Sequence, residues 1–480
     1  MKIKSLSVKD FFILKNDFTI NFDNNISIII GENGSGKSTL LELIADIFGH
    51  LHKYFILNDK TADFVDGYCI VYEYIKEGEI YTIEIKSHYI NQKTNTFAPE
   101  ICINGEILSI SQVDKKYGGM TSFLPDKIVL NYTGISDHLK RLSEHFEHKF
   151  TQSIIKTNNN YSLYPLNLPK DRPFIYIKPE HLSIITLSLL FSTDVSDKKF
   201  ISEYLGIDDN SCEIKLMFKK PFWAKKSSSS KWWGSSGNVA EQFLDTVYNY
   251  ADIKDYNESK SILTCLFYGT LSLWDSFRKL EANKSEIVFT ILDTLLFDDL
   301  LSDIQITWKQ GETSISLSRL SEGQKQIILT AGINHIFGYN ENILYLFDEP
   351  DVFLHPKWQQ DFLDILKRGF NENSMAIITT HNPIIIGNIR REDIHIIKDG
   401  QEIPNEYFSY GRDVNSLLYD YFNIHERSSF GESLIQNFYD AMDKKDYHQA
   451  EAILTKLRTT FGEGDIEVVK ADSMYDDLAD

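Results

Sequence analysis

Residues 31–38 read Gly-Glu-Asn-Gly-Ser-Gly-Lys-Ser, which has the spacing of a phosphate-binding loop, G-x-x-x-x-G-K-[ST]. The loop follows an apolar, strand-like run, Asn25–Ile30, and precedes a run with apolar residues at helical spacing, Leu40–Phe48. In such a strand–loop–helix unit the glycines let backbone N–H groups surround a β-phosphate, and the helix N-terminus favours negative charge. The sequence therefore predicts that the chain binds a nucleoside triphosphate.

The loop supplies the residues that we expect to contact ATP. Lys37 is expected to reach the β- and γ-phosphates and to act in catalysis, and the Ser38 hydroxyl is expected to bind Mg²⁺. The residues assigned to ATP binding here are Gly31, Glu32, Asn33, Gly34, Ser35, Gly36, Lys37, Ser38 and Thr39.

A second motif lies where an apolar run, Ile343–Phe347, ends in Asp348-Glu349-Pro350-Asp351. A buried parallel strand that ends in carboxylates delivers them to the edge of the sheet where ligands bind in open α/β folds. We expect Asp348 to hold Mg²⁺, directly or through water, and Glu349 to orient the water that attacks the γ-phosphate. The alternative is a strand followed by an acidic turn, and the phosphate-binding loop favours the first interpretation.

Two further segments can be interpreted beside these motifs. Leu320-Ser321-Glu322-Gly323-Gln324 precedes apolar residues at helical spacing, and alone it indicates only the start of a helix. The predicted strand Met375–Thr379 ends in Thr380-His381-Asn382-Pro383. A lone histidine at such a position is more often structural, but beside the other motifs His381 is expected to contact the γ-phosphate.

The order of these four motifs resembles the head of ABC-type ATPases. Within that superfamily it resembles the soluble branch that contains RecF, the chromosome-maintenance (SMC) ATPases and bacterial defence ATPases, since Asp351–Pro356 matches the D-x-x-L-H-P run of that branch. The resemblance covers about residues 1–135 and 300–400. It implies an α/β fold, a mixed sheet carrying the phosphate-binding loop beside an antiparallel layer.

The resemblance also assigns roles to the remaining motif residues. Leu320–Gln324 corresponds to the family signature, which closes over the nucleotide held by a second chain and so makes a homodimer with two sandwiched ATP molecules. The residues that this implies for ATP binding are Ser321, Gly323, Gln324 and Asp351, the last at the dimer interface. His381 corresponds to the switch histidine and, with Glu349 and Lys37, completes the expected catalytic set.

One family element is missing from its expected place. A glutamine that senses Mg²⁺ should follow a strand between the phosphate-binding loop and the insertion. The predicted strand Lys127–Asn131 is followed by Tyr132-Thr133-Gly134, without a glutamine. Neither Gln92 nor Gln112 stands at the end of a predicted strand.

The motifs divide the chain into four expected regions. Residues 1–135 and 301–400 make the two parts of the ATPase head, residues 136–300 an inserted, mostly helical lobe, and residues 401–480 a C-terminal helical hairpin. The first region contains an expected antiparallel meander around Asn104-Gly105. Prolines interrupt the insertion and no heptads persist, so a coiled-coil arm is not expected.

Inside the insertion, Lys215–Gly237 combines six lysines with interleaved aromatic residues and has no acidic residue. Such a segment can grip phosphates and stack on bases. The interpretation that we favour is a solvated loop whose tryptophans pack under the lobe, and DNA or partner binding are the alternatives.

Composition limits the functional classes. The net charge is −20, from 49 basic and 69 acidic residues, so any DNA contact must be local or come through a partner. Four well-separated cysteines suit a reducing cytosol. The most apolar stretch, Leu182–Phe191, is too short to span a bilayer. We expect a cytoplasmic protein without a membrane contact.

The tail after His381 narrows the resemblance. Tyr410–Leu418 contains Gly-Arg-Asp-Val-Asn-Ser and leads into two helical stretches, as in the PtuA family of the Septu anti-phage system. That resemblance implies an ATPase that forms dimers and higher oligomers and controls a separate HNH endonuclease, PtuB. Two alternatives remain: a RecF-like DNA-repair ATPase that clamps DNA directly, and a PARIS-like scaffold that holds a toxin nuclease with little hydrolysis.

Overall fold

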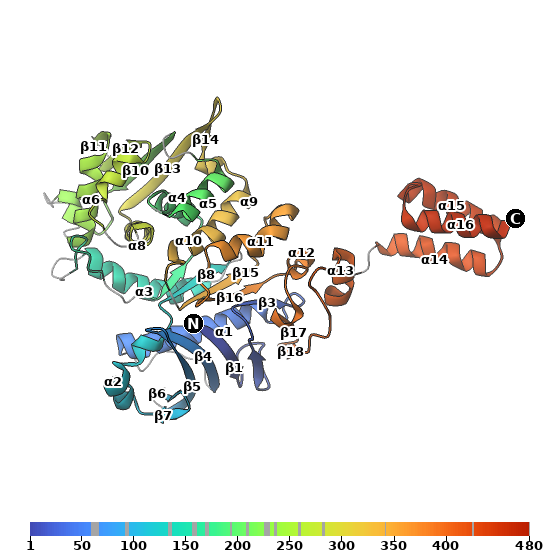
Figure 1. Cartoon of the computed structure of the whole chain (residues 1–480), viewed down its shortest axis with the longest axis horizontal. Helices are drawn as coiled ribbons and strands as arrows, with labels where there is room; N and C mark the ends of the chain where they lie inside the picture. The colour runs from blue at the N-terminus through green and yellow to red at the C-terminus, as the bar shows by residue number, and fades with distance from the viewer. Residues whose placement is uncertain are drawn as a thin grey trace. The chain divides into compact units, whose positions relative to one another are not determined.

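A seven-stranded sheet carries the phosphate-binding loop at the centre of the larger of two units (Figure 1). The computed structural model describes residues 1–58, 67–91, 96–132, 137–155, 161–168, 172–192, 194–207, 211–224, 231–234, 238–257, 261–280, 284–340, 342–424 and 427–479. Its two units are Met1–Tyr410 and Gly411–Asp480.

The central sheet is parallel except at one edge. Its strands, in spatial order, are β18 (Gln401–Ile403), β17 (Ile394–Lys398), β3 (Ile26–Ile30), β16 (Met375–Thr379), β15 (Ile343–Asp348), β8 (Lys127–Tyr132) and β9 (Phe174–Tyr176), and β18 alone is antiparallel to its neighbour. The predicted strands before the loop, before the two carboxylates and before His381 are confirmed. Every residue of β3, β15 and β16 is buried, as expected for strands covered on both faces.

The antiparallel layer expected beside the loop is also present. Its strands, in spatial order, are β2 (Phe18–Asn21), β1 (Lys2–Val8), β4 (Tyr68–Lys76), β5 (Glu79–Asn91), β6 (Thr96–Ile103) and β7 (Glu106–Leu108). Asn104 and Gly105, both with positive φ, make the predicted turn between β6 and β7. Helix α1 (Lys37–Leu57) shares one hydrophobic core with this layer and the central sheet. Helix α2 (Ile110–Tyr117) and the short 3₁₀ turn η1 (Met120–Phe123) follow β7.

The inserted lobe differs from the prediction in its sheet and in its borders. Its helices are α3 (Asp137–Ile155), α4 (His181–Leu190), α5 (Val195–Leu205), α6 (Asn238–Tyr250), α7 (Leu271–Ser276) and α8 (Lys284–Phe297). A five-stranded antiparallel sheet joins β11 (Ile253–Asn257), β12 (Ile262–Tyr268) and β10 (Cys212–Lys219) to β13 (Leu301–Gln310) and β14 (Thr313–Ser316). The border predicted at residue 300 therefore cuts through a sheet, and β9 belongs to the central sheet.

The described part of Lys215–Gly237 is anchored in this lobe. Trp223 donates its indole N–H to the carbonyl of Asp298 at 3.2 Å, and Trp232 donates to Asp245 Oδ1 at 2.5 Å. Trp233 is buried. Residues 225–230 and 235–237 lie outside the described residues. The three tryptophans support the interpretation in which they pack under the lobe.

A buried ion cluster joins the lobe to the strand β9. The Arg172 guanidinium contacts Asp293 and lies 3.6 Å from Glu147 Oε1, and His181 Nε2 lies 2.7 Å from Asp293 Oδ1. Burial by itself raises the pKa of the Asp293 carboxyl, but Arg172 and His181 hold that pKa well below its usual value. The cluster is fully buried, so each charge depends on its partners.

We expect Arg172→Met to destabilise the protein by about 3–5 kcal/mol, because it removes the cation that the buried Asp293 and Glu147 carboxylates share. Thermal and denaturant unfolding measure the loss. The matched control is Lys140→Met in the exposed Lys140–Glu144 pair, for which we expect a change below about 0.5 kcal/mol. An Arg172 variant that unfolds like this control would contradict the importance of the cluster.

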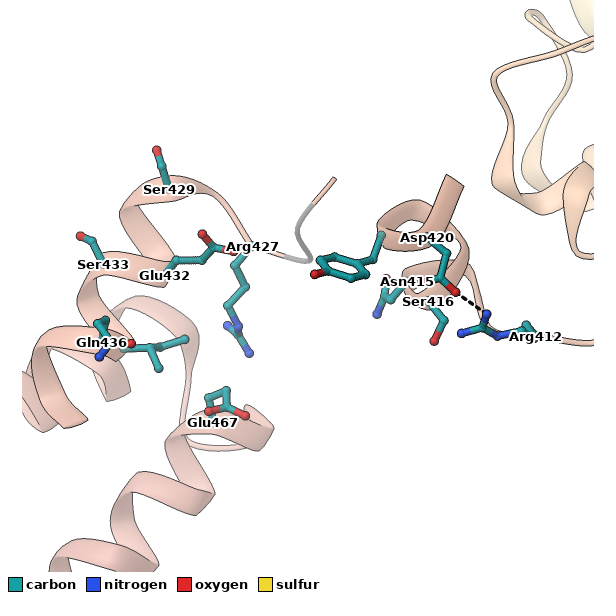
Figure 2. Close-up of a pocket in the computed structure, with 12 residues that line it drawn as sticks. Arg412, Asn415, Ser416, Asp420, Arg427, Ser429, Glu432, Ser433, Gln436 and Glu467 are labelled. Atoms are coloured by element: carbon teal, nitrogen blue, oxygen red, sulfur yellow. Dashed lines mark hydrogen bonds and ion pairs between the residues drawn. The ribbon is translucent and has the colours of Figure 1, made fainter. Parts of the chain in front are cut away.

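The C-terminal unit contains three packed helices after a first short one, where the sequence predicted a hairpin. They are α13 (Val414–Phe422), α14 (Ser429–Asp443), α15 (Tyr447–Phe461) and α16 (Ile466–Ala479). The core of the last three includes Phe438, Leu454 and Val468, so α16 completes the predicted pair. A groove of about 840 Å³ lies between α13 and α14, and Glu467 of α16 also lines it. Figure 2 shows its lining side chains, which are mostly polar.

Cysteines and helix lengths agree with the sequence-based expectations. All four cysteines are free thiols. No helix in the described part of the chain combines the length and apolarity needed to cross a bilayer.

Candidate nucleotide-binding site

The phosphate-binding loop is shaped by glycines that no other residue can replace. Gly31 has φ 154°, and a Cβ there would lie 2.1 Å from the Ile397 carbonyl oxygen. Gly36, with φ 115°, precedes the first residue of α1 and packs against Leu14. Both positions need glycine because of positive φ and close neighbours. The loop therefore leads from β3 directly into the N-terminus of α1, as the sequence predicted.

The Lys37 ammonium folds back onto the backbone of the phosphate-binding loop. Its ammonium donates to the carbonyl oxygens of Gly31 and Glu32, each at 3.1 Å. Burial lowers the pKa of Lys37, while the nearby Glu349 and Asp348 act in the opposite direction. The ammonium is thus held in a cradle of oxygen atoms, which phosphate oxygens can replace when a triphosphate enters.

Ser38 and Asp348 come together at the predicted metal site. The Ser38 hydroxyl lies 3.0 and 3.1 Å from the two carboxylate oxygens of Asp348, and the Thr379 hydroxyl donates to Asp348 Oδ1 at 2.6 Å. Burial raises the pKa of Asp348, and the two hydroxyl donors lower it. A hydroxyl and a carboxylate are the oxygen ligands that Mg²⁺ prefers, so this pair fits the ion. The sequence did not single out Thr379, which orients Asp348 from the neighbouring strand β16.

Glu349 and His381 face each other where β15 and β16 end. His381 Nε2 lies 3.5 Å from Glu349 Oε1. Burial and the Lys37 charge lower the pKa of His381, which favours the neutral ring. Glu349 has φ 48°, and its N–H donates to the Thr379 hydroxyl at 3.0 Å. A carboxylate in this strained backbone, next to an imidazole, is able to position a water molecule.

Asp351, which is expected at the dimer interface, is buried within its own chain. Its side chain is only 5% exposed, and Asp351 Oδ2 accepts a hydrogen bond from the Thr380 hydroxyl of the same chain at 3.0 Å. Burial raises its pKa, and the hydrogen bonds from Thr380 and Asn382 lower it. Asp351 therefore braces the segment around His381 from within, and the exposed side chains of this turn are Val352 and Phe353.

The signature forms the start of a helix, α9 (Glu322–Ile327). Ser321 is its N-cap, and Ser321 and Gln324 make a reciprocal capping box through Gln324 N to Ser321 Oγ and Ser321 N to Gln324 Oε1. Gln324 also donates to the Tyr204 carbonyl on α5 at 3.4 Å. Among the described residues, the hydrogen bonds of the Ser321 side chain stay inside this cap. The exposed helix end is thus free to meet another molecule.

Gly323 explains how the signature is held beside the second motif. A Cβ there would lie 3.0 Å from the Phe353 carbonyl and 3.2 Å from the Trp358 ring on α11 (Pro356–Arg368). A side chain at this position would force these neighbours to shift by a few tenths of an ångström, so glycine suits the close packing. Helix α12 (Pro383–Ile386), capped by Asn382, follows His381 on the other side.

The segment after β8, where the family resemblance leads us to expect a glutamine, lies outside the described residues. The strand β8 extends through Tyr132, and Thr133 and Gly134 lie outside the described residues. Gln112 belongs to the capping box of α2, where it accepts from Ser109 N, and Gln92 lies outside the described residues. The last residues of β8, Asn131 and Tyr132, occupy the edge of the sheet beside Asp348.

The phosphate-binding loop, the paired carboxylates and His381 each follow a strand of one mixed sheet, and the signature begins a helix packed beside them. This arrangement is that of an SMC/RecF-like ATPase head of the ABC type. The sequence profile of the AAA ATPase domain family (AAA_15) matches residues 1–386, and the chain belongs to this family. The C-terminal unit lies beyond the match.

Three relatives have names that describe their systems. The Retron Ec83 probable ATPase of Escherichia coli is 22% identical over 96% of this chain and 84% of its own length. The Retron Vc95 probable ATPase of Vibrio cholerae serotype O1 biovar El Tor is 22% identical over 83% and 74%. The Septu protein PtuA of Bacillus mycoides (strain KBAB4) is 21% identical over 73% of this chain and 53% of its own length.

Solved structures give a weaker comparison. The SMC head domain from Thermotoga maritima is 15% identical, with a TM-score of 0.35 over 85% of this chain and all of that domain.

Proposed function

We propose that the chain is the ATP-binding and ATP-hydrolysing subunit of an anti-phage defence complex, and that ATP drives its dimerisation. The observation that carries the proposal is the meeting of Lys37, Ser38, Asp348, Glu349 and His381 at one edge of the sheet. Lys37 would bind the β- and γ-phosphates, and Ser38 with Asp348 would hold Mg²⁺. Bound Mg²⁺ would supply positive charge to the transferring phosphoryl group.

The site of one chain is incomplete on the side of the γ-phosphate. In the proposed dimer, the N-terminus of α9 from a second chain covers this side and presents the Ser321 hydroxyl and backbone N–H groups to the phosphate. Because each chain provides both halves of a site, two ATP molecules would lie at a twofold axis. Higher oligomers of such dimers remain part of the proposal.

The defence role rests on the relatives named for retron and Septu systems. In this proposal the nuclease is a separate chain, and the resemblance to the PtuA family favours an HNH endonuclease. Direct DNA clamping is less favoured, because the described tryptophans of Lys215–Gly237 are anchored in the lobe and the net charge is −20. The intact Glu349 argues against a scaffold that holds ATP without hydrolysing it.

The defence role is tested by phage challenge of cells that express the chain with the product of its neighbouring gene. We expect wild-type cells to survive, and cells carrying Lys37→Ala or Glu349→Gln to lyse. Co-purification then identifies the partner as an HNH nuclease or another protein. Survival that does not depend on either residue would contradict an ATP-dependent role.

The sandwich is tested by Ser321→Asp with Ser321→Asn as its matched control. Both residues are good N-caps, so helix α9 should form in each variant. The aspartate places a negative charge against the triphosphate of the second chain, so we expect at least about tenfold more ATP to be needed for dimerisation. Light scattering during size-exclusion chromatography measures the dimer, and calorimetry should show unchanged ATP binding to the single chain. Equal dimerisation of the two variants would contradict the sandwich.

A further inference from the structure

The end of strand β8 lies between the predicted metal site and the signature helix of the same chain. Strand β8 lies beside β15 in the central sheet (Figure 1). In this parallel pair, Tyr132 is opposite Asp348 and Asn131 is opposite Phe347. Successive residues of a strand point to opposite faces, so these two neighbours serve different surroundings. This short segment is therefore able to contact two parts of the site at once.

Asn131 makes a buried hydrogen bond to the signature helix. Its Nδ2 donates to the Thr330 hydroxyl at 3.1 Å, and Gln326 Nε2 lies 3.4 Å from the same oxygen. Asn131 is 5% exposed and Thr330 is completely buried. Buried polar groups need their partners, so this bond fixes one distance between the sheet and the helix.

Thr330 lies in an unusual turn of that helix. The helix continues from α9 through a π-helical turn, η4 (Ile328–Gly332), into α10 (Ile333–Phe337). Such turns interrupt the regular helical ladder and are frequent at functional sites. Gly332 in the same turn packs against Ile185 of α4, where a Cβ would approach within 2.9 Å. The π-turn thus contacts the central sheet on one side and the inserted lobe on the other.

The contact between β8 and the signature helix is not close-packed. A cavity of about 200 Å³ lies between them, and its lining includes Asn131, Tyr132, Gln326, Leu329 and Phe353. Side chains that line a cavity lose part of their packing contacts. A directional hydrogen bond at the edge of a loosely packed contact therefore matters more for the orientation of the helix than it would in a close-packed core.

Tyr132 connects this contact to the metal site. Tyr132 is opposite Asp348 in the pairing of β8 with β15, and its phenol makes a hydrogen bond with Ser38. The phenol is thus near both residues that are proposed to hold Mg²⁺. Adjacent residues of one strand touch the metal site and the signature helix.

We propose that Asn131 and Thr330 are positioning residues, whose hydrogen bond holds the signature helix at the angle required to close over the ATP of a second chain. The inference rests on the proposed ATP sandwich. The pair touches neither the nucleotide nor the metal, and it acts by orienting Ser321 through the helix that carries both Ser321 and Thr330. The end of β8 takes the place in which the sequence lacks a glutamine.

The test uses Asn131→Leu and Thr330→Val, which remove the donor and the acceptor with little change in size, in full-length protein carrying Glu349→Gln. Each single change is expected to raise the ATP concentration for half-maximal dimerisation about tenfold. Calorimetry of the dilute, monomeric chain should show an ATP affinity within about twofold of the parent. The double variant is expected to be no worse than Thr330→Val alone, since the bond between Asn131 and Thr330 is lost only once and Gln326 loses the Thr330 hydroxyl in both variants.

The matched control is Thr186→Val. Thr186 is completely buried on α4, and within the described part of the chain its hydroxyl donates only to the Leu182 carbonyl in its own helix. We expect this control to dimerise like the parent, although its melting temperature falls by a similar amount to that of Thr330→Val. A loss of dimerisation that tracks melting temperature in all variants would overturn the positioning role.

Two further outcomes are distinct. If the Glu349→Gln parent dimerises with ATP and the Asn131 and Thr330 variants match it, the positioning role is wrong and the sandwich stands. If the parent binds ATP but stays monomeric at all concentrations, the sandwich is wrong, and the positioning role is overturned with it.

Discussion

Replacement of Lys37 by alanine is expected to weaken ATP binding by at least about 100-fold. The change removes the cation from the oxygen cradle formed by Gly31 and Glu32, where a charge-assisted bond to phosphate is worth about 3 kcal/mol. The Lys37 side chain is buried, so its ammonium is already partly desolvated before ATP binds. Isothermal titration calorimetry with ATP and Mg²⁺ measures the loss.

The control for Lys37→Ala is Lys53→Ala, which removes a lysine near the other end of α1. We expect this variant to bind ATP like the wild-type protein. Circular dichroism and thermal unfolding show whether both variants keep the fold. Unchanged affinity in a folded Lys37→Ala protein would overturn the assignment of the loop and, with it, the proposed function.

The sequence predicted the parts of the fold that local patterns encode. The run Ile26–Ile30 and the run Ile343–Phe347 are mostly apolar because both faces of the central sheet are covered, and each leads into its motif. The spacing of the loop residues fixes a turn, and Asn104-Gly105 fixes another. These elements could be predicted because their geometry depends on neighbours in the chain.

Pairings between distant segments could not be predicted in the same way. Strand β9 has only three residues and pairs with β8. The residues of Phe174–Tyr176 contain no pattern that predicts this pairing. Strand β13 alternates buried and exposed residues, but the sequence does not say that it pairs with β10 of the insertion. Register between distant strands is a property of the assembled core.

The site shows the same division. The motifs placed Lys37, Ser38, Asp348, Glu349 and His381 correctly at one edge, because parallel strands present their carboxyl ends together. The burial of Asp351 and the bond between Asn131 and Thr330 depend on tertiary contacts. The absent glutamine after Lys127–Asn131 was the one sequence signal that pointed to the end of β8.

Glu349→Gln is expected to slow ATP hydrolysis by at least about 100-fold and to leave ATP binding intact. Glutamine keeps the size of the side chain and its hydrogen-bonding oxygen, but it cannot accept a proton from the attacking water. The backbone should not change, because the Glu349 N–H bond to the Thr379 hydroxyl involves no side-chain atom of Glu349. Phosphate release under saturating ATP and Mg²⁺ measures the rate.

The same change is expected to reveal the assembled state. If the exit from the ATP-bound dimer requires hydrolysis, a protein that binds ATP but cannot cleave it accumulates as a dimer, whereas the wild-type protein returns to monomer as ATP is consumed. The matched control is Glu106→Gln in the antiparallel layer, which removes one carboxylate that pairs with Lys116 and should leave both properties unchanged. A Glu349→Gln protein that hydrolyses ATP at the wild-type rate would exclude Glu349 as the general base. Slow hydrolysis with intact ATP binding but without a trapped dimer would instead contradict the ATP sandwich.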